Sequence, residues 1–130
     1  MIEKIISITP FEDNDCGYKV LTNKQEIVFA IDNSSNCCEE WGYFSTNDDI
    51  QYFIGSKLIE ISTTNSELDT KVFLDVCKSK GHHLDEGEMM FVNLTTSKGV
   101  LQFVVYNQHN GYYSHAAYIK SNKLSEVRYI

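Results

Sequence analysis

A run of consecutive apolar residues, Ile27, Val28, Phe29, Ala30 and Ile31, constrains the fold of this chain more than any other feature. Neighbouring side chains of a β-strand point to opposite faces of the sheet. An unbroken apolar run of this length therefore predicts a strand that is buried on both faces. Such a strand is expected at the centre of a sheet.

Further strands are predicted over residues 2–8, 18–21, 57–62, 88–95, 100–106 and 112–119. In the first of them, Ile2, Ile6 and Ile8 are expected on one face. Pro10 should end that strand, because proline cannot donate to a sheet ladder, and residues 11–17 should form an acidic loop. Residues 18–21 and 26–31 should pair as a hairpin. The last three strands should form a meander, with turns at 97–99 and 107–111.

Two helices are predicted between these strands. A short one should follow a cap at Thr46 or Asn47 and stop at Gly55. A longer one should span residues 67–80, where apolar side chains recur at helical spacing. We therefore predict one α+β domain over residues 1–130, with a mostly antiparallel sheet of about six or seven strands.

Charge narrows the range of partners. The chain has 18 acidic and 11 basic residues, so its net charge is −7. Phosphate backbones and anionic lipids repel such a surface, so we expect neither nucleic-acid nor membrane binding. Arg128 is the only arginine, so an anionic ligand must be held by lysines, amides, hydroxyls or backbone N–H groups. The sequence contains no pattern of a signal peptide or membrane span, which predicts a cytoplasmic protein.

Motifs for catalysis and metal binding are missing from the sequence. Cys37 and Cys38 are adjacent, as are His82 and His83, and adjacent side chains of a strand point apart. No nucleophile elbow, Walker loop or dinucleotide-binding motif occurs. We therefore expect no metal, no cofactor and no catalytic residues. A metal- or thiol-dependent hydrolase is therefore the least favoured of the three functions that the sequence allows.

Residues 106–115 combine aromatic, amide and imidazole groups at the predicted last hairpin. Flat rings beside neutral donors and acceptors suit recognition of a base, a ribose or a protein partner. The opposing interpretation is ordinary turn chemistry and strand packing. The candidate ligand-binding residues are Tyr106, Asn107, His109, Asn110, Tyr112 and Tyr113, with Trp41 and Tyr43 as a second aromatic group.

The predicted strand 112–119 also bears on assembly. It carries no charged residue before Lys120, and exposed edge strands are commonly covered by pairing or by charge. We therefore expect a homo-oligomer built from dimers.

Several short patterns resemble a known domain: Cys37-Cys38-Glu39, then Asp49-Ile50, then Ile54-Gly55-x-x-Leu58, and finally residues 110–114 with the sequence N-G-Y-Y-S. Together they resemble a small domain of unknown function found in tailed bacteriophages, over roughly residues 37–119. In size, acidity and strand-helix order the chain is also similar to the Thoeris anti-defence sponges of phages.

These resemblances imply a function. They imply a phage-encoded, non-catalytic protein that sequesters a cyclic ADP-ribose-like immune signal in the cytoplasm of an infected bacterium. The second alternative is an acidic inhibitor that covers the basic nucleic-acid channel of a host defence nuclease, as a DNA mimic does. Because the acidic residues are scattered through the sequence and form no long stripe, the sponge is favoured.

Overall fold

The apolar run of the sequence forms β3 (Glu26–Asp32), the middle strand of an antiparallel sheet. The computed structural model describes residues 2–33, 40–47, 49–64, 75, 78, 88–108, 115–122 and 124–130. Within them, this sheet has five strands in the order β1-β2-β3-β8-β9. The remaining strands of this sheet are β1 (Ile5–Glu12), β2 (Asp15–Thr22), β8 (Ala116–Lys120) and β9 (Ser125–Tyr129).

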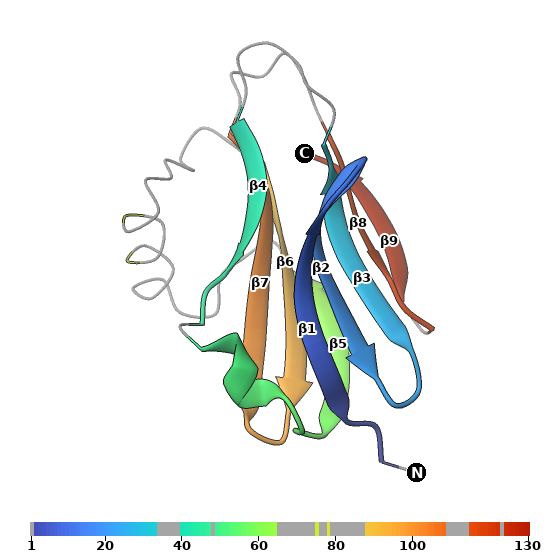
Figure 1. The fold of residues 1–130 in the computed structure, drawn as a ribbon. Helices are drawn as coiled ribbons and strands as arrows, with labels where there is room; N and C mark the ends of the chain where they lie inside the picture. The colour runs from blue at the N-terminus through green and yellow to red at the C-terminus, as the bar shows by residue number, and fades with distance from the viewer. Residues whose placement is uncertain are drawn as a thin grey trace.

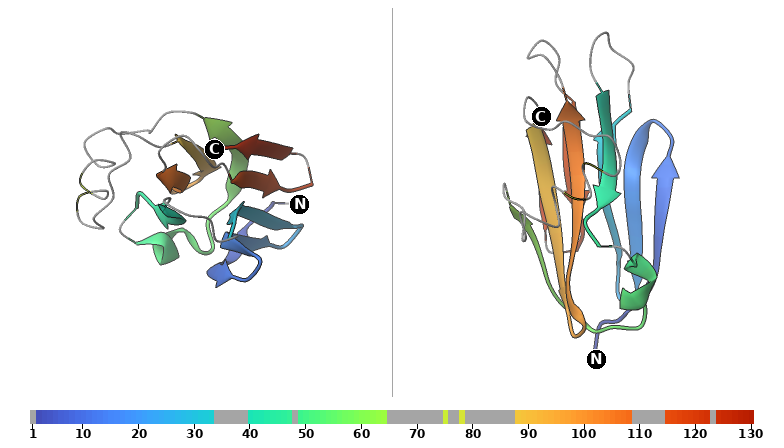
Figure 2. Two further views of the ribbon diagram at one scale, coloured as in Figure 1. Left: turned by 90° about the horizontal axis from the view of Figure 1, so that it is seen from above. Right: turned by 90° about the vertical axis from the view of Figure 1, so that its left-hand side faces the viewer.

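A second antiparallel sheet packs against the first. It has four described strands in the order β4-β7-β6-β5. Their bounds are Glu40–Ser45 for β4, Leu58–Thr64 for β5, Glu88–Thr96 for β6 and Gly99–Gln108 for β7. Figure 1 shows β4, β7 and β6 to the left and β3, β8 and β9 to the right, and Figure 2 shows the two layers from above.

The prediction of an α+β fold is wrong. Across the described residues the chain is a β-sandwich, with a single 3-10 turn, η1 (Ile50–Phe53), where the short helix was predicted. The cap is Asp49, whose side chain accepts from the backbone N–H of Gln51 at 3.1 Å. Gly55 has φ of 86°, a left-handed conformation that glycine adopts without strain. Residues 67–80, the longer predicted helix, lie outside the described residues except for Asp75 and Lys78. No described helix is long and apolar enough to cross a membrane.

The first strand differs from its prediction in where it ends and in which side chains it buries. β1 continues through Pro10, which pairs with Tyr18, so most of the predicted loop 11–17 belongs to β1 and β2. The sheet tolerates Pro10 because β1 is an edge strand, with no ladder partner on one side. A register shift between Ile5 and Ser7 also changes the facing of side chains, so that Ile5 and Ile8 are buried and Ile6 is exposed.

The predicted meander is correct only in its first hairpin. β6 and β7 pair as expected, and so do β2 and β3 of the earlier hairpin. The third strand begins at Ala116 and pairs with β3 and β9 of the other sheet. β7 and β8 belong to different sheets, so they do not pair as the second hairpin of the predicted meander. Asn107 and Gln108 of the predicted turn belong to β7, and residues 109–111 lie outside the described residues. β8 is also an interior strand, so it is not the edge on which oligomerisation was predicted.

Aromatic rings connect the two sheets at the centre of the core. Phe29 of β3 lies 4.6 Å from Phe103 of β7 between ring centroids, and Tyr18 of β2 lies 4.6 Å from the same phenylalanine. Tilted rings at these separations attract each other beyond the effect of area burial alone. A smaller cluster of Phe44, Phe91, Val104 and Tyr106 lies on the other face of the four-stranded sheet.

The close approach of β2 and β3 at Gly17 provides a test of the five-stranded sheet. A Cβ atom at Gly17 would lie 2.6 Å from Cα of Ala30 and still closer to the carbonyl oxygen of Phe29. We expect Gly17→Ala to lower the free energy of unfolding in urea by about 1–3 kcal/mol, because backbone must move. Gly42→Ala is the matched control. Its Cβ would meet only the Tyr106 side chain, with Oη nearest at 2.9 Å. Equal losses for the two variants would contradict the account.

Candidate functional site

The face of the five-stranded sheet that points away from the core carries an ordered row of side chains. Register pairs place Phe11, Gly17, Ala30, Tyr118 and Val127 side by side across all five strands. Gly17 and Ala30, the second and third members of this row, are its smallest residues, and larger groups stand on either side of them. This arrangement leaves room for the Tyr118 side chain to reach across β3 to β2.

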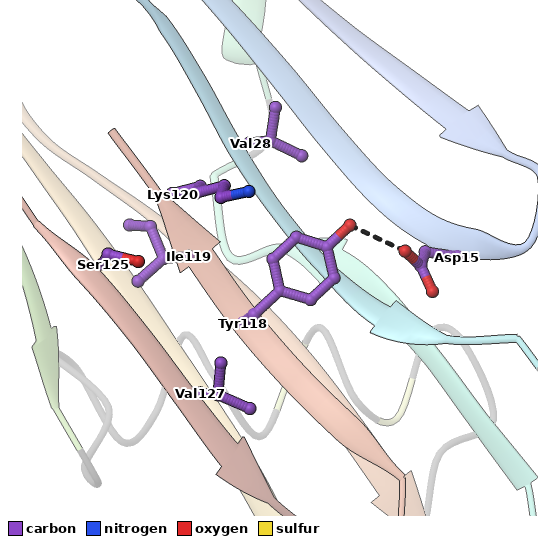
Figure 3. Close-up of a pocket in the computed structure, with 7 residues that line it drawn as sticks. All are labelled: Asp15, Val28, Tyr118, Ile119, Lys120, Ser125 and Val127. Atoms are coloured by element: carbon purple, nitrogen blue, oxygen red, sulfur yellow. Dashed lines mark hydrogen bonds between the residues drawn. The ribbon is translucent and has the colours of Figure 1, made fainter. Parts of the chain in front are cut away.

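A pocket of about 430 Å³ lies on this face. That volume lies within the usual range for small-molecule sites, roughly 300–1,000 Å³. Strands β2, β3, β8 and β9 all contribute to its lining (Figure 3). The lining residues are Asp15, Val28, Tyr118, Ile119, Lys120, Ser125 and Val127.

Tyr118 crosses the sheet to reach Asp15. Its hydroxyl donates to Oδ2 of Asp15 at 2.8 Å, and because β3 lies between β8 and β2, this hydrogen bond spans a whole strand (Figure 3). Burial raises the pKa of the Tyr118 phenol to about 12, and the hydrogen bond to Asp15 and the charge of that carboxylate act in the same direction. The ring is therefore fixed in place, and its hydroxyl remains a donor at neutral pH.

Two lysines place positive charge on this face of the sheet, and one of them, Lys120, lines the pocket with Tyr118. Lys19 and Lys120 both pair with Val28, one from each neighbouring strand, and both are exposed. The Nζ atom of Lys19 lies 4.9 Å above the ring of Phe11, a cation–π contact that orients it on this face. In a chain of net charge −7, the pocket thus combines a flat ring, a carboxylate and an ammonium group.

The candidate residues of β7 are packed into the protein. Tyr106 is 5% exposed and its ring lies 5.8 Å from that of Phe44. Asn107 is fully buried, and its Nδ2 donates to the carbonyl oxygen of Ile130 at 3.1 Å. His109, Asn110, Tyr112 and Tyr113 lie outside the described residues. In this structure Tyr106 and Asn107 contribute to packing, and a ligand could reach them only if that packing opened.

Trp41 and Tyr43 link the two sheets. The Trp41 ring stacks on His115 at 4.6 Å, and its Nε1 donates to Oδ1 of Asn33 at 3.1 Å. Tyr43 donates to Oε1 of Glu12 at 3.2 Å. Burial raises the pKa of Tyr43 to about 12, and Glu12 adds to the shift. The structure brings Trp41 opposite Asn107 in the ladder between β4 and β7, so two of the predicted residues are neighbours.

The described residues offer little for nucleophilic or metal chemistry. Cys16 is the one described cysteine. Burial raises the pKa of its thiol to about 11, and the charges of three nearby carboxylates contribute. A thiol in that state is almost wholly protonated at neutral pH, so Cys16 is a poor nucleophile. No group of three or more His, Cys, Asp or Glu residues suited to a metal occurs in the described part of the chain.

No motif in the sequence marks Asp15, Tyr118 or Lys120 as site residues. Asp15 was assigned to a loop, although it begins β2. Tyr118 lies in the predicted strand 112–119, but the sheet face of its side chain does not enter the prediction of the site. The available signal was the alternation across β8, where buried Ala117 and Ile119 flank a half-buried tyrosine on the opposite face.

Comparison with known proteins gives a family match and no further relative. A family model described as a domain of unknown function, DUF7448, matches residues 1–119. The strand β9 lies beyond the matched residues. No curated protein and no solved structure matches the chain.

The raised pKa of Tyr118 predicts a specific loss of stability at alkaline pH. The phenol ionises at pH 10.0 when unfolded and at about 12 when folded, so its contribution is complete below pH 10 and is lost as the pH rises toward 12. Tyr118→Phe should unfold with less dependence on pH in this window than the wild type, measured by urea denaturation at each pH. The same dependence in both proteins would show that folding does not raise the pKa of the Tyr118 phenol.

Proposed function

Because the chain belongs to the DUF7448 family, whose description names no activity, we propose its function from the pocket: it is a non-catalytic protein that binds a small nucleotide-type ligand. The observation that carries this proposal is the grouping of Tyr118, Asp15 and Lys120 around one pocket on the outer face of the five-stranded sheet. The narrower form of the proposal is that a phage encodes the protein and uses it to sequester a cyclic ADP-ribose-like immune signal.

Each part of the pocket matches one part of a nucleotide. The half-buried Tyr118 ring offers a fixed surface on which a base can stack, which contributes roughly 1–3 kcal/mol. The carboxylate of Asp15 can accept hydrogen bonds from ribose hydroxyls. The ammonium group of Lys120, which lines the pocket, can hold phosphate as a point charge, which suits a chain whose only arginine is Arg128.

Binding without turnover is supported by the state of the pocket's reactive groups. The Tyr118 phenol is held protonated by its raised pKa, so it can donate a hydrogen bond but is a poor base at neutral pH. The one described thiol, that of Cys16, which follows Asp15 in β2, is also protonated. These groups favour retention of a ligand over its chemical conversion.

The proposal is tested by titration calorimetry with cyclic ADP-ribose isomers and with cyclic di- and trinucleotides. We expect wild-type protein to bind at least one of these compounds. Tyr118→Ala should weaken that binding about tenfold to a hundredfold, because it removes the stacking surface. Lys120→Met should weaken binding of phosphate-bearing compounds while the protein remains folded.

A tyrosine outside the pocket provides the matched control. Tyr52 on η1 is 56% exposed, and Lys98 Nζ lies 4.9 Å above its ring, so this pair resembles the pocket's tyrosine and lysine in type. Tyr52→Ala should leave affinity unchanged. Failure of wild type to bind any compound would refute the proposal and favour the acidic inhibitor of a host nuclease. If Tyr118→Ala binds as tightly as the wild type, the binding site would instead be at Trp41 and Tyr43.

A further inference from the structure

The edges of the two sheets differ in how well they are protected against pairing with another chain. β1 contains Pro10 and an irregularity after Ile5, and β5 contains an irregularity between Leu58 and Glu60. Such features interrupt the ladder that an added strand would need. None of residues 41–45 of β4 has an exposed side chain. β1 and β5 are therefore poor templates for a further strand, and residues 41–45 of β4 offer a partner no exposed apolar side chain.

β9 contains neither a proline nor an irregularity in its ladder. All its residues pair with β8 in unbroken register, and among the described strands it has no neighbour on its other side. Val127 is 58% and Tyr129 73% exposed, both on the face that carries the pocket. A regular edge with exposed apolar side chains is a site where another strand can add.

Two charges on the opposite face of β9 are arranged in a self-complementary way. Glu126 and Arg128 form an ion pair at 3.1 Å, and Thr63 of β5 hydrogen-bonds to both, which orients them. The segment Ser125–Tyr129 has no net charge, although the whole chain carries −7. The segment itself therefore adds no net repulsion between two copies.

We propose that β9 pairs antiparallel with β9 of a second copy, about a twofold axis at Val127. In this register Val127 faces its own counterpart, and Glu126 of each copy faces Arg128 of the other. A shift that centres the pair on Glu126 or on Arg128 places like charges opposite each other, which is destabilising. The charges thus select one register, and the contact is isologous, as in most dimers.

The pairing joins two five-stranded sheets into one continuous sheet. Val127 and Ser125 line the pocket on its β9 side, so the second copy's β9 would form an additional wall there. The pockets of the two copies would then lie on one face, on either side of the twofold axis. Dimer formation itself requires no ligand, so it can be tested separately from the proposed nucleotide binding.

Charge reversal tests the register. Glu126→Arg and Arg128→Glu each place like charges opposite each other in a homodimer, twice by symmetry. We expect wild type to sediment as a dimer at micromolar concentration and each variant to dimerise about tenfold more weakly or worse. An equimolar mixture of the two variants should recover the dimer, because every charge on one copy then faces its opposite on the other.

In the mixture each variant still lacks its own Glu126–Arg128 ion pair. Recovery of the dimer would therefore report the contact between chains and not the stability of each fold. If either reversal prevents folding, Val127→Lys replaces it as the test. Because Val127 is exposed, this variant should fold, and it should be a monomer. Ile59→Lys on β5, where the exposed fraction is 60%, is the matched control and should remain dimeric. A monomeric wild type, variants that dimerise normally, or a mixture that does not recover would each overturn the proposal.

Discussion

Phe29 and Phe103 meet between the two sheets with their ring centroids 4.6 Å apart, and the remaining structure depends on this contact. Phe29 lies in the middle strand of one sheet and Phe103 in an interior strand of the other, so their packing fixes which face of each strand is buried. Once Phe29 faces inward, its neighbours Val28 and Ala30 face outward with Tyr118 and Lys120. The pocket is therefore a consequence of how the core is packed.

The sequence predicted the elements that local patterns control. The run from Ile27 to Ile31 identified the central strand, and the turn residues between 22 and 25 and between 97 and 99 identified two hairpins. Pairing between distant segments was not accessible in the same way. Ile31 pairs with Ala117, and nothing in residues 112–119 indicates which sheet they join. The strand β9 was missed because polar Glu126 and Arg128 alternate with its apolar residues and point inward at a sheet edge.

The candidate site shows the same limit. Trp41, Tyr106 and Asn107 drew attention because aromatic and amide groups cluster in the sequence, yet the same groups serve packing when they face a core. Tyr118 has no unusual neighbours in sequence, and its role depends on Asp15 two strands away. An aromatic residue indicates a binding surface only when its facing is known, and facing is set by register. Residues 109–114 lie outside the described part of the chain, so their predicted role stays a prediction.

We propose that the outer face of the five-stranded sheet is the ligand-binding surface. Amide NMR spectra recorded during titration with cyclic ADP-ribose or a cyclic dinucleotide test it most directly, because every backbone position is observed together. The largest changes in chemical shift should fall on Asp15, Val28 and the strand residues from Tyr118 to Lys120. Changes concentrated at Trp41, Tyr43, Tyr106 and Asn107, with none on the outer face, would contradict it.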